Sequence, residues 1–131
     1  MEKTVIVVED DHLIRSALKL SFEGAGYTVI AGSNIEMVAA MMSLKNYVTR
    51  ISLIAVVADY RLERGISGIT VIRCLEKLCC SRFRSVLITG DTDPTIGDQA
   101  RSAGLTLFRK PVSFDQLLAA VESDGRIAGA A

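Results

Sequence analysis

LIAVVADYRL, residues 53–62, is the stretch of this chain that decides its fold. Apolar residues run without interruption from Leu53 to Ala58 and stop at Asp59. A short apolar run with Val and Ile and no polar alternation is typical of a strand buried on both faces, and such strands belong to parallel sheets covered by helices. In open sheets of this kind, ligands bind just beyond the carboxyl ends of the strands. The run therefore predicts that Asp59 stands where chemistry can occur.

The composition indicates one domain and excludes several classes of function. The chain has 131 residues, half of them hydrophobic, so a single core can bury roughly two-thirds of the surface that the unfolded chain exposes. Its 15 basic and 15 acidic residues balance and form no block of one charge, so we expect no direct binding to nucleic acid. No apolar run approaches the ~20 residues of a membrane span. The start, MEKTVIVVEDD, predicts no signal peptide.

The cysteines indicate a reducing compartment. Cys74, Cys79 and Cys80 lack the spacing of a metal site and accompany an apolar helical pattern, which predicts buried or half-buried thiols in a cytoplasmic protein. A redox role for the adjacent pair Cys79 and Cys80 is the alternative, but adjacent cysteines rarely meet the geometry of a disulfide.

Strands and helices alternate along the whole chain. We predict strands at residues 4–8, 27–31, 51–58, 84–89 and 105–108 and helices at about 13–22, 35–44, 69–78, 94–103 and after Ser113, with a polar joint at 46–50 and a flexible tail at 123–131. Short strand–helix–strand units need right-handed crossovers, which favour a parallel sheet with helices on both faces. The predicted fold is a doubly wound, three-layer α/β sandwich. The chain lacks the glycine motifs of dinucleotide and phosphate loops.

Polar side chains gather at the carboxyl ends of four predicted strands. Glu9 and Asp10 follow the first strand, Asp59 ends the third, and Thr89 and Lys110 end the fourth and follow the fifth. Carboxylates gathered at one edge need a cation, and oxygen ligands suit Mg²⁺. The set describes a phosphoryl-transfer site with Asp59 as nucleophile, Lys110 and Mg²⁺ as neutralising charges and Thr89 as hydrogen-bond donor.

Four motifs in order resemble the receiver domain of two-component response regulators, over about residues 4–122. They are VIVVEDD at 5–11, VVADYRL at 56–62, LITGD at 87–91 and FRKP at 108–111. The resemblance implies a flavodoxin-like, five-stranded parallel sheet in the order 2-1-3-4-5 with five helices, an order for which a receiver protein is itself a standard example. It also implies one receiver domain in residues 1–131, whose DYRL and ITGD variants look most like receivers of hybrid sensor histidine kinases.

The resemblance implies a role for each matching residue. Asp59 matches the phosphoacceptor, Asp10 the direct metal ligand, and Glu9 an acidic residue that acts through water. The backbone carbonyl of Arg61 matches a further metal ligand, Thr89 the switch hydroxyl, and Lys110 the lysine that is followed by a cis proline. The implied partner is a histidine kinase or phosphotransfer domain, and the chain would be a monomer or a weak, phosphorylation-dependent dimer.

Two departures from the family pattern concern the region around the site. Leu107 stands where many receivers have an inward-turning aromatic residue, while Phe108 should face the other side of the sheet by strand alternation. The loop YRLERGISG carries what looks like one extra residue before Gly68. We expect the Arg61 side chain to project beside the phosphoryl site, where it either shields the phosphoryl group, contacts a partner, or is merely solvated.

Charged residues around the first acidic cluster have simpler interpretations. We predict that Asp11 is the N-cap of the first helix and that His12 is a surface residue of its first turn. We interpret Arg15 and Arg101 as solvated charges on helix faces.

Three classes of function remain open from the sequence. The first is a signalling switch whose only catalysis is its own phosphorylation and dephosphorylation. The second is a degenerate receiver that binds proteins without phosphorylation. The third is an aspartyl-nucleophile phosphohydrolase, which is disfavoured because such enzymes of the haloacid-dehalogenase type carry a second Asp where this chain has Arg61.

Overall fold

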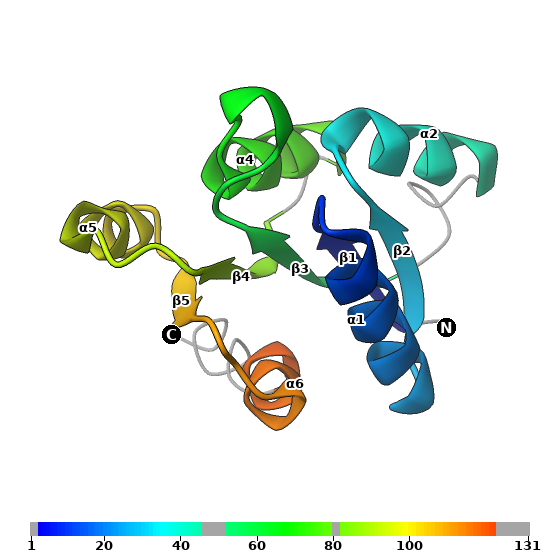
Figure 1. The fold of residues 1–131 in the computed structure, drawn as a ribbon. Helices are drawn as coiled ribbons and strands as arrows, with labels where there is room; N and C mark the ends of the chain where they lie inside the picture. The colour runs from blue at the N-terminus through cyan, green and yellow to red at the C-terminus, as the bar shows by residue number, and fades with distance from the viewer. Residues whose placement is uncertain (1–2, 46–51, 80–81, 123–131) are drawn as a thin grey trace.

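The computed structural model describes residues 3–45, 52–79 and 82–122, and these form alternating strands and helices (Figure 1). In chain order, the elements are β1 (Lys3–Val8), α1 (His12–Gly24), β2 (Thr28–Gly32), α2 (Ile35–Lys45), β3 (Ser52–Asp59), a 3₁₀ turn (Glu63–Gly65), α4 (Gly68–Cys79), β4 (Arg84–Thr89), α5 (Pro94–Ser102), β5 (Thr106–Arg109) and α6 (Phe114–Glu122). The polar joint at 46–50, Cys80 and the tail at 123–131 lie outside the described residues.

The five strands form one parallel sheet in the order β2-β1-β3-β4-β5. Helices α1 and α6 cover one face, and α2 and α4 cover the other, while α5 lies beside β4 and β5 at one end of the sheet (Figure 1). This confirms the flavodoxin-like, doubly wound sandwich with five helices that the sequence predicted. Element ends differ from the prediction by one or two residues, as at β3, which includes Asp59.

The apolar strands are buried because both of their faces contact helices. In β1, Val5 and Val7 belong to the cluster beneath α1 and α6, whereas Ile6 and Val8 belong to the cluster beneath α2 and α4. All four side chains are fully buried. Alternation therefore sends successive residues into two different cores, which explains why residues 5–8 of the strand are all apolar. None of the described helices has the length and apolar character that crossing a membrane requires.

Helix exposure was partly mispredicted. Cys74 is exposed rather than buried, and Cys79 is half-buried. Leu13, which fits the apolar spacing of α1, is 78% exposed because it lies in the first turn, on the side away from the sheet. Apolar residues at helical spacing predict one apolar face of a helix, but that face is buried only where the helix contacts the sheet.

The loop after β3 makes a tight turn and then presses α4 against the end of the strand. Arg64 and Gly65 both have a positive φ, and the Leu62 N–H donates to the Ile66 carbonyl at 3.0 Å. The Gly68 N–H then donates to the Tyr60 carbonyl at 2.8 Å. A Cβ at Gly68 would lie only 2.4 Å from the Asp59 carbonyl oxygen. Glycine is therefore required for α4 to begin this close to Asp59.

Candidate functional site

Adjacent strands bring three carboxylates together at the carboxyl edge of the sheet. β1 pairs with β3 so that Val8 lies opposite Ala58, which places the residues that follow each strand side by side. One carboxylate oxygen from each of Glu9, Asp10 and Asp59 lies within 4.8 Å of the others. We call these three residues, together with Lys110, the carboxylate edge. An oxygen cluster of this kind is suited to a hard divalent cation.

Glu9 is the buried member of the carboxylate edge. It is only 2% exposed, its Oε2 accepts a hydrogen bond from the Asp11 N–H at 3.2 Å, and its own N–H donates to the Gly32 carbonyl. Burial is the main reason why its pKa rises to about 7, and the nearby charge of Asp59 adds to the rise. Without a cation, ionising this carboxylate in the folded protein therefore costs free energy.

Lys110 supplies positive charge to the carboxylate edge. Its Nζ lies 3.1 Å from Asp59 Oδ2 and 3.9 Å from Glu9 Oε1. Burial lowers the pKa of Lys110, but its hydrogen bond to Asp59 and the charges of Glu9 and Asp59 outweigh that effect and leave the pKa raised. The backbone N–H of Lys110 donates to the Thr89 carbonyl at 2.7 Å, which fixes where the side chain begins. The bond from Lys110 to Pro111 is cis, as the resemblance implied.

Thr89 ends the neighbouring strand β4. It is 1% exposed, and its hydroxyl accepts a hydrogen bond from the Asp91 N–H at 3.0 Å. On β5, Leu107 packs with the α4 side of the sheet and Phe108 with the α6 side. This confirms that Phe108 faces away from the position at which an aromatic switch residue would stand.

The residues that follow Glu9 and Asp10 support the edge. Asp11 caps α1 as predicted, accepting from the N–H groups of Leu13 and Ile14 at 2.9 and 3.1 Å. His12 is exposed and contacts Arg15 at 3.2 Å. Arg15 is not simply solvated, because its Nη1 donates to the Glu9 carbonyl at 2.8 Å. That bond depends on the orientation of α1 over the sheet, which the sequence does not display.

Arg61 points across the mouth of the site to Asp91. Its Nε donates to Asp91 Oδ2 at 2.8 Å, its Nη2 forms an ion pair with the same oxygen, and its side chain is 68% exposed. Sequence reasoning missed Asp91 as its partner. The available signal was the opposite charge of Arg61 and Asp91 at equivalent positions. Each residue lies two positions beyond the end of its strand, which is Asp59 in β3 and Thr89 in the neighbouring β4. Arg101, by contrast, is the exposed helix-face charge that was predicted, paired only with Asp98 among the contacts described for it.

The arrangement can bind a cation and present one carboxylate to an electrophile. Asp59 is the member that Lys110 contacts most closely, and its side chain is 10% exposed. Negative charge that develops on oxygens bound there would meet the Lys110 ammonium. Phosphoryl transfer needs these two elements, position and neutralising charge, more than it needs proton transfer.

Comparisons with known proteins show the family and the fold of this chain. The family model of the response regulator receiver domain matches residues 5–122. A response regulator receiver domain protein from Clostridium thermocellum is similar in structure, with a TM-score of 0.73 and 21% identity over 92% of this chain and 91% of that chain. A receiver protein from Pseudomonas putida gives a TM-score of 0.74 and 23% identity over 95% of this chain and 98% of that chain.

One further similar structure contains a modified residue and bound groups. It is a response regulator protein from Burkholderia pseudomallei with a phosphorylated aspartic acid, a calcium ion and citrate. Its TM-score is 0.73 and its identity 23%, over 98% of this chain and 72% of that chain. No curated protein sequence matches the chain. At these identities, the solved structures establish the shared fold.

Proposed function

Since the chain belongs to the response regulator receiver family, a family of two-component signalling switches, we propose that Asp59 is its phosphoacceptor and takes a phosphoryl group from a phosphohistidine of a partner. The partner would be a histidine kinase or a phosphotransfer domain. The observation that carries the proposal is the 3.1 Å contact between Asp59 and Lys110, beside Glu9 and Asp10 at the end of β3. The modification would alter the surface formed by α5 and β5.

The residues of the edge divide the work of the transfer. An Asp59 carboxylate oxygen forms the new bond to phosphorus while the phosphorus–nitrogen bond of the phosphohistidine breaks and leaves imidazole. Lys110 neutralises charge on the phosphoryl oxygens, and Thr89 donates its hydroxyl hydrogen to one of them. Hydrolysis later returns the Asp59 carboxylate and inorganic phosphate, so the chain acts as a switch rather than a metabolic enzyme.

Glu9, Asp10, Asp59 and the Arg61 carbonyl would hold Mg²⁺. The donor set fits this ion, because three carboxylates converge and the buried Glu9 has a raised pKa that a bound cation would relieve. When bound, Mg²⁺ supplies positive charge that offsets the negative charge of the phosphoryl oxygens. The presence of Glu9, Asp10, Asp59, Thr89 and Lys110 at one edge argues against a degenerate receiver, and Arg61 argues against a phosphohydrolase.

The finer assignments rest on the sequence. The DYRL and ITGD motifs favour a receiver of the hybrid sensor kinase type, acting in the cytoplasm as a monomer or weak phosphorylation-dependent dimer. The exposed Leu13 on α1, close in the chain to Asp10, offers an apolar contact to a docked phosphodonor.

Labelling with acetyl phosphate tests the proposal. Wild-type protein should become phosphorylated with Mg²⁺ and should remain unlabelled when EDTA is present from the start, and Asp59→Asn should show no labelling. Asp11→Asn is the matched control, because it changes a neighbouring carboxylate that caps α1 while keeping the capping oxygen. Equal labelling of Asp59→Asn and the wild type would refute the assignment of the acceptor. An unlabelled wild type would favour the degenerate receiver.

A further inference from the structure

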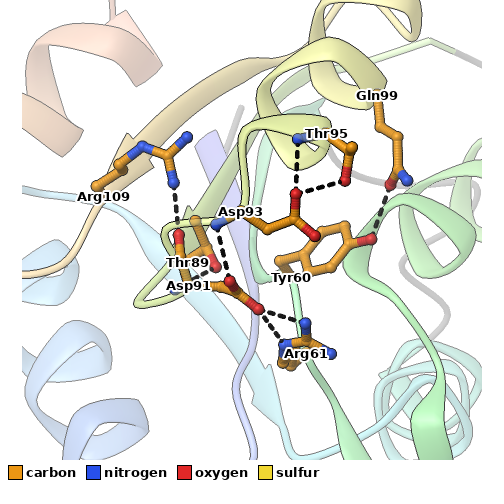
Figure 2. A network of polar contacts seen from close by, with 8 residues as sticks. All are labelled: Tyr60, Arg61, Thr89, Asp91, Asp93, Thr95, Gln99 and Arg109. Carbon is orange, nitrogen blue, oxygen red and sulfur yellow. Dashed lines mark hydrogen bonds and ion pairs between the residues drawn. The ribbon is translucent and has the colours of Figure 1, made fainter.

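A polar network centred on Asp91 connects the site to α5 (Figure 2). We call it the Asp91 network, and its members are Tyr60, Arg61, Thr89, Asp91, Asp93, Thr95, Gln99 and Arg109. Tyr60 and Arg61 directly follow Asp59 in the chain, whereas Asp93 caps α5 and Gln99 lies within it. The network therefore runs from the end of β3 to a helix that belongs to a different part of the sheet.

Asp91 contacts four segments of the fold at once. Its N–H donates to the Thr89 hydroxyl at 3.0 Å, its Oδ1 accepts from the Asp93 N–H at 2.9 Å, and its Oδ2 accepts from Arg61 Nε at 2.8 Å. Arg109 of β5 donates to its carbonyl. The bond from the Asp93 N–H, followed by the bond from Arg61, holds the pKa of Asp91 below its usual range, so the carboxylate stays charged.

The position of helix α5 can respond to changes in the Asp91 network, because few of its side chains pack against the rest of the protein. Only Ile96 and Ala100 of its nine residues are buried, and the helix lies at the edge of the molecule, beside β4 and β5 (Figure 1). Its N-terminus is fixed by Asp93, whose Oδ1 accepts from the Thr95 N–H and hydroxyl, both at 2.9 Å. Where apolar contacts are few, polar contacts determine the position of an element.

Tyr60 provides a second tie to the same helix. Its hydroxyl donates to Gln99 Oε1 at 2.7 Å, and its ring lies 5.7 Å from the Arg61 guanidinium carbon. Tyr60 and Leu107 pack against the same core cluster, on the α4 side of the sheet. An aromatic side chain thus reaches α5 from the residue after β3, whereas the apolar residue that β5 places on that side is Leu107.

We propose that Asp91 is a positioning residue, which holds Thr89 and α5 in their unphosphorylated arrangement, and that Arg61 and Tyr60 transmit the state of Asp59 to α5. This inference rests on the proposed function, because it presumes that Asp59 is phosphorylated. A phosphoryl group there carries more negative charge than the Asp91 carboxylate and would compete for the Arg61 guanidinium. A shift of the Thr89 hydroxyl towards that group would also remove the acceptor of the Asp91 N–H.

Hydrogen exchange of the α5 amides, measured with and without Mg²⁺ and beryllofluoride, tests the inference. Asp91→Asn keeps an oxygen for the Asp93 N–H but loses the charge that pairs with Arg61. Its α5 amides should exchange about two- to fivefold faster than those of the wild type in the resting state. Beryllofluoride should change their exchange rates less than it changes those of the wild type. Tyr60→Phe, which removes one hydroxyl, should shift α5 exchange in the same direction. Arg101→Gln, which removes a separate exposed ion pair on α5, should match the wild type.

The outcomes separate this inference from the proposed function. Binding of beryllofluoride is followed independently by fluorine NMR. If the wild type binds it and Asp91→Asn shows the α5 exchange of the wild type in both states, Asp91 does not position the helix and only this inference is wrong. If Arg101→Gln accelerates exchange as much as Asp91→Asn, the effect is one of general helix stability, and the inference is again wrong. If the wild type does not bind beryllofluoride, both the proposed function and the inference fall.

Discussion

The carboxylate edge and the region of α5 are held in opposite ways. At the edge, Glu9 is 2% exposed, and Asp59 ends a strand that lies between β1 and β4 and whose end packs against Gly68, the first residue of α4. Around α5, the contacts are exposed and polar, as the 68% exposure of the Arg61 side chain illustrates. A site that performs chemistry needs fixed geometry, while a surface that changes state needs a small energetic gap between its states. The difference indicates that chemistry and response occupy separate parts of one sheet edge.

The largest expected effect concerns the buried charge of the edge. The pKa of Glu9 rises from an ordinary value of 4.5 to about 7 in the folded protein, so its contribution to stability is complete below about pH 4.5 and is lost as the pH rises to about 7. In EDTA above pH 7, Glu9→Gln should therefore be more stable than the wild type by up to about 3 kcal/mol. Urea unfolding at several pH values measures this.

Mg²⁺ provides the control for the Glu9 prediction. The ion should stabilise the wild type more at pH 8 than at pH 5, because a proton on Glu9 competes with the metal. Glu9→Gln should lose most of this pH dependence. An equal Mg²⁺ effect at both pH values would contradict the view that Glu9 belongs to the metal site.

A smaller effect should follow from adding one methyl group at the packed end of β3. Gly68→Ala would place a Cβ 2.4 Å from the Asp59 carbonyl oxygen and 2.8 Å from a Leu87 methyl carbon. Overpacking of this kind should cost about 2 to 3 kcal/mol, measured by urea unfolding. The substitution should also slow labelling of Asp59, because α4 must move away from the end of the strand. A neutral effect would show that the edge is less rigid than its packing indicates.

A glycine-to-alanine substitution within α5 should change the stability in the opposite direction and by the smallest amount. At Gly97, inside α5, the nearest atom to a new Cβ is an Arg109 guanidinium nitrogen at 3.8 Å, which is ordinary contact. Gly97→Ala should therefore stabilise the protein by about 0.5 to 1 kcal/mol, because alanine loses less backbone entropy in a helix. Urea unfolding of this variant beside Gly68→Ala compares the two regions directly. Destabilisation at Gly97 would remove the contrast between them.

Sequence patterns predicted the edge well because the edge is built from strand ends. A buried strand such as β3 is recognised by its unbroken apolar run, and the end of that run marks the residue that reaches the edge of the sheet. Asp59, Glu9 and Thr89 could therefore be located from the amino-acid sequence. The strand order, by contrast, came from the family resemblance, because periodicity alone does not say which strands are neighbours.

Features that depend on side-chain direction could not be predicted in this way. Arg15 donates to the Glu9 carbonyl, Leu13 is exposed, and Arg61 pairs with Asp91 although its side chain stays largely exposed. Each depends on how a helix or loop is rotated over the sheet. Long side chains can satisfy the same sequence pattern in several directions, and tertiary contacts choose among them.

The bond between Tyr60 and Gln99 gives the molecule an optical signal of its own. The chain contains three tyrosines and no tryptophan, so phenol emission is not lost by energy transfer to an indole. A phenol that donates to an amide oxygen emits differently from one in water, and here the acceptor sits on α5. With Tyr27→Phe and Tyr47→Phe, the remaining native tyrosine would follow that helix in real time without an attached dye.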